Sequence, residues 1–137
     1  MHRRDLQDLS KLRLKEARVL LSAQHWSGAY YLAGYAAECA IKACIAKKTM
    51  RGDFPNKGFA NQVHTHDVVA LVKAAGLQSQ LDQRIKDPGT FAVNWTIVKD
   101  WDVSSRYTTA SESEARDLLS ALTARKEGVI PWIKQHW

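Results

Sequence analysis

Apolar residues recur at helical spacing near the start of the chain. They alternate with charged side chains and stand at Leu6, Leu9, Leu12, Val19 and Leu20. This pattern predicts an amphipathic helix over about residues 5–24, with these apolar side chains facing inward. The stretch HWSG then interrupts the pattern, and Ser27 is a candidate N-cap for a second helix.

The second predicted helix runs from about Gly28 to Lys48 and is rich in alanine. Its alanines are Ala29, Ala33, Ala36, Ala37, Ala40, Ala43 and Ala46. Alanine is the strongest helix former, and its small side chain lets neighbouring helices approach closely. Lys47 and Lys48 stand in the last turn, where positive charge complements the helix dipole.

Shorter elements are expected in the middle of the chain. The stretch RGDFPNKGF, residues 51–59, predicts a loop by its Gly, Pro and Asn content. A third helix is expected to begin near His66 and Asp67 and to end at Gly76. Residues 77–85 predict another helical turn or two. Residues 91–109 leave two structures open, a short helix or an ordered loop packed on the bundle.

The last predicted helix begins at a capping box formed by Ser111 and Glu114. Its apolar positions are Leu118, Leu119, Leu122, Val129, Ile130 and Ile133. Pro131 should kink or break this helix near Gly128.

Strand signals are almost absent, so the pattern predicts an all-α protein. Four main helices joined by modest loops indicate an antiparallel up-and-down four-helix bundle with one or two extra short helices, as a single domain over residues 1–137. The first 21 residues are charged throughout, so neither a signal peptide nor a membrane span is expected. Cys39 and Cys44 are five residues apart, about 140° around one helix, and are expected to be reduced, buried thiols of a cytoplasmic protein.

Positive charge is concentrated in the first part of the chain. The net charge is +6, and residues 1–57 hold 11 basic and 5 acidic side chains, whereas the rest holds 9 of each. A basic half suits an acidic partner or a nucleic-acid backbone, and a solvated face with a positive bias is the simpler explanation.

Glu38 and Lys42 are the charged pair within GYAAECAIKAC, residues 34–44. Four residues apart with glutamate first, they suit an ion pair on a helix surface. The functional alternative is that both project into a groove or a dimer seam, where a buried pair is costly unless it is used.

His64 and His66 form an H-x-H sequence beside Asp67. Nothing completes a metal site at recognised spacing, so a helix start capped by Thr65 or Asp67 is favoured. No glycine-rich phosphate loop, nucleophile elbow or zinc-protease motif occurs in the sequence.

The stretch WDVSSRYTT brings Trp101, Arg106 and Tyr107 together. An arginine fork suits phosphate, and aromatic rings beside it suit base stacking. The structural alternative is that the aromatic rings pack on the bundle and that Arg106 pairs with Asp102 or Glu38.

Taken in order, these segments resemble the HEPN family of small all-α domains over about residues 8–135. The family's second helix has the form A-x-x-x-x-E-x-x-x-K-A, which Ala33, Glu38, Lys42 and Ala43 match. The family's histidine before its third helix corresponds to His66. Its S-R-Y corresponds to the segment 105–107, which reads Ser-Arg-Tyr here.

This resemblance implies a four- or five-helix bundle that forms homodimers and works beside a minimal nucleotidyltransferase. One branch of the family cuts RNA with an R-x(4–6)-H motif, in which the histidine moves a proton and the arginine holds the phosphate. After Arg106, the positions open to that histidine hold Ser111, Glu112 and Ser113. The only formal match, Arg18 to His25, falls in the first helix and its turn.

The favoured hypothesis is therefore a HEPN-like dimeric binding module of a toxin–antitoxin or related system. It would bind a nucleotide, RNA or a nucleotidyltransferase partner, with no cofactor, metal ion or membrane. The alternative is a metal-independent ribonuclease toxin of the HEPN class. The candidate ligand-binding residues are Glu38, Lys42, His66, Trp101, Arg106 and Tyr107.

Overall fold

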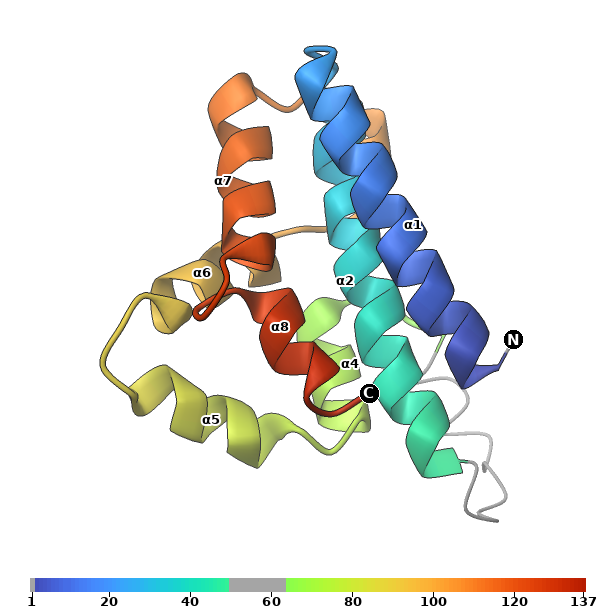
Figure 1. Ribbon diagram of the computed structural model, residues 1–137, viewed down its shortest axis with the longest axis vertical. Helices are drawn as coiled ribbons and strands as arrows, with labels where there is room; N and C mark the ends of the chain where they lie inside the picture. The colour runs from blue at the N-terminus through green and yellow to red at the C-terminus, as the bar shows by residue number, and fades with distance from the viewer. Residues whose placement is uncertain (1, 50–63) are drawn as a thin grey trace.

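A computed structural model of the protein describes residues 2–49 and 64–137, and these residues form helices and turns without a strand (Figure 1). The all-α prediction is confirmed. The α-helices are α1 (Arg3–Ser22), α2 (Trp26–Thr49), α4 (Val68–Ala74), α5 (Gln78–Lys86), α6 (Phe91–Lys99), α7 (Glu112–Thr123) and α8 (Val129–Lys134), with a 3₁₀ helix, η1 (Val103–Tyr107). The loop predicted for residues 51–59 lies outside the described residues.

Helices α1 and α2 run antiparallel along one side of the molecule, and α7 packs on α2 from the other side (Figure 1). The shorter helices α4, α5, α6 and α8 fill the remaining space beside α2 and α7. The four-helix arrangement therefore stays a prediction, since the described residues contain three helices of 12 residues or more and four shorter ones.

The inward face of α1 differs from the prediction at two of the five apolar positions, since Leu6, Leu9 and Leu20 are partly buried. Its buried residues are Ser10, Leu14 and Ala17, and the Ser10 hydroxyl donates a 2.7 Å hydrogen bond to the carbonyl of Ala36 in α2. Leu12 and Val19 lie on the opposite side, 49% and 62% exposed. Apolar spacing alone missed this because a buried serine and a buried alanine take the contact with α2.

Helix α2 is the centre of the core. Six of its seven alanines are fully buried, as close helix packing requires, and only Ala46 is partly exposed. Ser27 is not the N-cap, because α2 already begins at Trp26. Its hydroxyl instead accepts a 2.9 Å hydrogen bond from the backbone N–H of Ala110, which ties the start of α2 to the segment before α7.

Both cysteines are free and buried, as predicted. Burial raises the pKa of the Cys39 thiol to about 11 and that of the Cys44 thiol to about 12. The Cys44 thiol donates to the carbonyl of Ile133 in α8, with 3.7 Å between sulfur and oxygen. Both thiols are therefore poor nucleophiles at neutral pH.

The predicted helix signals in the second half are confirmed. Asp67 caps α4 by accepting from the N–H groups of Val69 and Ala70, and Ser111 and Glu114 form the capping box of α7. The last predicted helix breaks between Thr123 and Val129. Pro131 falls in the first turn of α8, where its missing N–H costs little.

The segment 91–109 combines both of the predicted structures. It contains the helix α6, the 3₁₀ helix η1 and an extended stretch that leads into α7. No helix among the described residues is both long and apolar enough to cross a bilayer.

Candidate binding site beside α2

Glu38 is a buried carboxylate in the middle of α2. Its Oε1 atom lies 2.6 Å from Nδ1 of His66, in the turn just before α4. The His66 side chain is 46% exposed, so it covers the carboxylate on one side and meets solvent on the other. A buried carboxylate needs such a donor, because an unpaired one carries a large desolvation cost.

The turn that presents His66 is held on both sides of this residue. The backbone N–H of Asp67 donates to the hydroxyl of Thr65 at 3.1 Å, and Asp67 caps α4. Lys42 is partly exposed one helical turn along α2, and the ion pairs within the described ranges include none between Lys42 and Glu38. The local ion pair predicted from their spacing is thus replaced by a contact between residues 28 positions apart.

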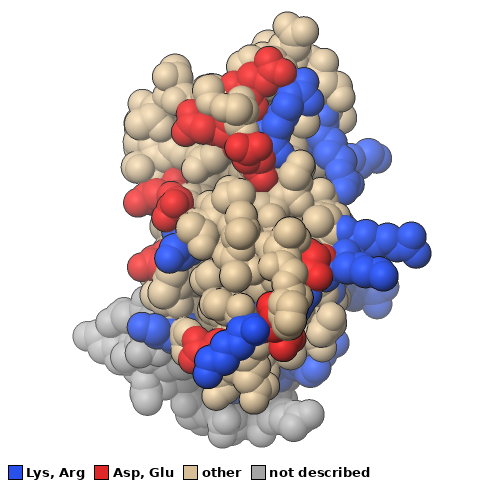
Figure 2. Space-filling model, turned by 90° about the vertical axis from the view of Figure 1, so that its left-hand side faces the viewer, with Lys and Arg blue, Asp and Glu red and all other residues tan. Residues whose placement is uncertain are grey.

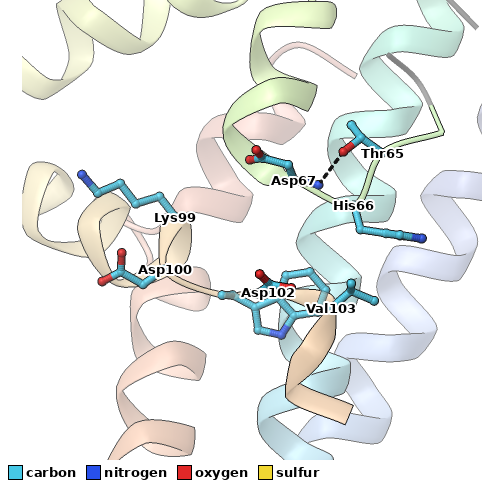
Figure 3. Close-up of a pocket in the computed structure, with 8 residues that line it drawn as sticks. Thr65, His66, Asp67, Lys99, Asp100, Asp102 and Val103 are labelled. Carbon is cyan, nitrogen blue, oxygen red and sulfur yellow. Dashed lines mark hydrogen bonds between the residues drawn. The ribbon is translucent and has the colours of Figure 1, made fainter. Parts of the chain in front are cut away.

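A hollow of about 520 Å³ lies between the His66 turn and the segment from α6 to η1 (Figure 3). It is lined by Thr65, His66, Asp67, Lys99, Asp100, Trp101, Asp102 and Val103. Three aspartates and a single lysine make the lining acidic. The His66 ring points away from Lys99 and Asp100 in Figure 3, so its basic group does not face that part of the hollow.

Trp101 joins the hollow to the core and is only 3% exposed. Its indole lies against the backbone of α2 at Gly34, where an added Cβ would come within 2.1–2.2 Å of the ring. The Tyr31 ring packs beside it, with 6.1 Å between ring centroids. Only a glycine at position 34 leaves room for this indole, so Gly34 sets the path of the chain into η1.

Helix η1 presents Arg106 and Tyr107 to solvent. The Asp102 side chain caps η1 through the N–H of Ser104 at 2.9 Å, and the bond from Ala110 to Ser27 holds the chain beyond it. The Arg106 guanidinium carbon lies 5.3 Å from the centroid of the Tyr107 ring, and Tyr107 is 81% exposed.

Arg106 is exposed and has no carboxylate partner among residues 2–49 and 64–137. The structural alternative, in which Arg106 pairs with Asp102 or Glu38, is therefore wrong for these two partners. By contrast, Arg84 and Arg116 each hold a carboxylate at 2.8 Å.

The predicted site residues thus fall into separate groups along α2. Glu38 and His66 meet directly, and Trp101 packs one turn away at Gly34. Arg106 and Tyr107 follow toward the start of α2, whereas Lys42 lies in the other direction, about 12 Å beyond Gly34 at 1.5 Å per residue.

No three metal-ligating side chains converge within the described parts of the chain. Sequence reasoning missed the close approach of Trp101 at Gly34 and did not assign the three aspartates to a common hollow. The alternation Asp-Trp-Asp at 100–102 was the available signal for the latter.

A family model described as the HEPN domain matches residues 4–136. The chain belongs to the HEPN family. The resemblance drawn from the α2 motif, His66 and the Ser-Arg-Tyr segment is confirmed at the level of the family. Neither the curated proteins nor the solved structures compared with this HEPN domain gave a match.

Proposed function

We propose that this HEPN domain is a dimeric binding module for a nucleotide-containing ligand, free nucleotide or RNA, which Arg106 and Tyr107 contact. The observation that supports the proposal is the stacked, solvent-exposed Arg106–Tyr107 pair on η1. A large aromatic ring that is 81% exposed buries little apolar surface within this chain. A ligand that stacks on the ring would bury that surface.

The two side chains have complementary chemistry for such a ligand. The planar guanidinium of Arg106 offers paired donors that match phosphate oxygens, and the Tyr107 ring offers a face to a base. A base stacked on an aromatic ring contributes about 1–3 kcal/mol per base. Because Arg106 is not tied to a carboxylate of the described residues, its charge is free for a phosphate.

The hollow beside Trp101 has a supporting role in this proposal. Its aspartates disfavour a phosphate inside it, so the ligand's phosphate is placed outside, at Arg106. Trp101 anchors the start of η1 on α2, and the Glu38–His66 contact fixes the neighbouring turn. These three are positioning residues, whereas Lys42 lies in the other direction along α2 and is left out of the proposed contact.

The face of the domain formed by α5, α6 and α7 is a poorer surface for nucleic acid. Figure 2 shows acidic side chains gathered in its upper half, at the height of α7, and basic ones mainly along one edge. The first turn of α7 alone carries Glu112 and Glu114. Charge of mixed sign gives no continuous positive path for a phosphate backbone.

A second copy of the chain is the proposed partner for the outer face of α1. Leu12 and Val19 are seven residues apart, which places them on one stripe, and both are largely exposed. A second copy packed on this face would remove the apolar surface of both side chains from water. A nucleotidyltransferase is the competing partner for this stripe.

The binding proposal is tested by fluorescence anisotropy with a labelled single-stranded RNA and, separately, with mononucleotides. Arg106→Ala and Tyr107→Ala should each weaken binding about tenfold or more, whereas Tyr107→Phe should retain it. Arg125→Ala is the matched control, because Arg125 is also exposed but lies in the turn between α7 and α8. If Arg106→Ala and Arg125→Ala weakened binding equally, the loss would come from the change in net charge, and the proposed site would be refuted.

Incubation with RNA in EDTA tests the ribonuclease alternative. Cleavage that Arg106→Ala abolishes would favour this alternative.

A further inference from the structure

A second hollow, of about 460 Å³, lies near the other end of α2. Its floor is apolar and formed by the buried residues Cys44, Ala75 and Leu77. It sits where the end of α2, the turn between α4 and α5, and the residues after α8 come together. Figure 1 shows the end of the chain beside the lower half of α2, and the bond from Cys44 to Ile133 confirms that contact.

Each polar side chain around this hollow can donate a hydrogen bond. The polar side chains that line it are Lys47, Lys48, Gln80, Gln135 and His136. No aspartate or glutamate of the described ranges is among its lining residues. Its charge is therefore opposite in sign to that of the hollow beside Trp101, where three aspartates outnumber one lysine.

Lys48 lies over one wall of the hollow, and the charge of Lys47 changes the pKa of two of its lining residues. A Cβ built at Gly76, which has φ +72°, would lie 2.5 Å from Nζ of Lys48, so this ammonium stands directly over the α4–α5 turn. Burial lowers the pKa of His136, and the positive charge of Lys47 lowers it further. The same charge of Lys47 lowers the pKa of the Cys44 thiol against the larger, opposite effect of burial.

The dipole of α2 explains why lysines stand in its last turn, but it does not explain why polar side chains from other segments surround them. Lysines in the last turn of α2 complement its dipole wherever their ammonium groups point. That effect does not require them to converge with His136, Gln80 and Gln135 on one concave surface. The imidazole and the glutamine amides add neutral donors to two positive charges, and this donor set is complementary to the oxygens of a phosphate group.

We propose that this hollow binds the phosphate group of a phosphate monoester. Lys47 and Lys48 pair with the phosphate oxygens, and His136 and the two glutamine amides donate hydrogen bonds to them. The site is independent of the Arg106–Tyr107 pair, which lies on η1 near the opposite end of α2.

Calorimetric titration with ribose 5-phosphate, inorganic phosphate and ribose tests the proposal. None of these probes has a base that could stack on Tyr107. Both phosphates should bind and ribose should not. Lys47→Ala and Lys48→Ala should each weaken binding about tenfold or more, whereas Lys73→Ala, at an exposed lysine of α4 outside the hollow, should leave it unchanged. The His136 imidazole resonances should shift on titration with inorganic phosphate.

RNA that carries a 5′-phosphate or a 5′-hydroxyl distinguishes the two sources of such a group. Stronger binding of the 5′-phosphorylated strand, lost in Lys47→Ala, identifies the end of a nucleic acid. If both RNA strands bind equally and ribose 5-phosphate still binds, the ligand is a small phosphorylated molecule.

Two results would overturn the proposal. One is that neither ribose 5-phosphate nor inorganic phosphate binds. The other is that both lysine variants, with unchanged circular dichroism, bind ribose 5-phosphate as well as the original chain does. Arg106→Ala should not affect ribose 5-phosphate, so the two proposed sites can fail separately.

Discussion

Nδ1 of His66 lies 2.6 Å from Oε1 of Glu38, and this contact joins the turn before α4 to the middle of α2. Glu38 is buried, whereas His66 is nearly half exposed. The pair therefore satisfies a core carboxylate with a side chain that solvent can still reach. The contact also fixes the His66 turn, which forms one wall of the hollow beside Trp101.

Removal of this donor should destabilise the fold. His66→Ala leaves the Glu38 carboxylate without the donor it has here, and an unsatisfied buried group costs about 1–3 kcal/mol. Urea denaturation should show a fall of this size in the free energy of unfolding. His64→Ala is the control, because His64 is exposed and should change stability by no more than about 0.5 kcal/mol.

A double-mutant cycle separates the contact from the individual residues. Glu38→Gln, His66→Ala and the double variant should show a coupling free energy of about 0.5–3 kcal/mol. Additive effects would mean that the two side chains are independent, contrary to the geometry.

Gly34 should not accept even a methyl group. A Cβ at this position meets the Trp101 ring at 2.1–2.2 Å, so Gly34→Ala must displace the indole, and overpacking of this kind costs about 1–3 kcal/mol. Urea denaturation and the near-ultraviolet circular dichroism of the tryptophans measure the effect. Gly28→Ala in the same helix is the control: its Cβ meets the movable end of Leu20 at 3.1 Å, so the change should be small. Similar losses in both variants would contradict the assigned packing of Trp101.

The buried thiols predict a loss of stability at alkaline pH. In the unfolded chain they ionise near their ordinary pKa of 9.0, whereas burial raises the pKa of Cys39 to about 11 and that of Cys44 to about 12 in the folded state. The unfolded state therefore releases protons first, and the free energy of unfolding should fall as pH rises above 9.

A Cys39→Ala/Cys44→Ala variant provides the comparison for this prediction. Its stability should depend less on pH between 9 and 10, below the ordinary pKa of the tyrosines, in denaturant titrations at each pH. Identical slopes for the variant and the original chain would show that the thiols do not titrate differently on unfolding. Both thiols should also resist iodoacetamide at pH 8 until the chain is unfolded.

The outer stripe of α1 should control self-association. Leu12→Asp/Val19→Asp puts two charges on the proposed interface, so the dimer should dissociate in sedimentation velocity runs over a concentration series. Lys86→Asp, at an exposed position of α5, should leave association unchanged. A monomeric original chain at every concentration would contradict the proposed homodimer. A dimer that the α1 variant leaves intact would place the interface elsewhere.

Local sequence signals predicted the elements well. The Asp67 cap, the Ser111–Glu114 box and the break near Gly128 each depend on residues within a few positions of one another, and each is confirmed. Alanine spacing likewise identified the buried helix. The HEPN resemblance, which depends on the order of such segments, is confirmed by the family match.

Contacts between residues far apart in the sequence could not be predicted from patterns of neighbouring residues. The spacing of Glu38 and Lys42 suggested a pair within one helix, but the partner of Glu38 is His66. Ser27 has the chemistry of an N-cap, yet its hydroxyl accepts from Ala110, 83 positions away. Leu12 looked like a core residue because its exposure depends on which side of α1 meets α2.

The most direct test of the proposed function is a ¹⁵N–¹H titration of the folded domain with a short 5′-hydroxyl single-stranded RNA. The 5′-hydroxyl leaves the Lys47–Lys48 hollow without a terminal phosphate. Arg106 and Tyr107 are then predicted to be the principal contacts. The largest shift changes should fall on residues 103–110 and on the Tyr107 ring, and they should disappear in Arg106→Ala. Binding that leaves residues 103–110 unperturbed, or no binding of RNA or mononucleotide at all, would contradict the proposal.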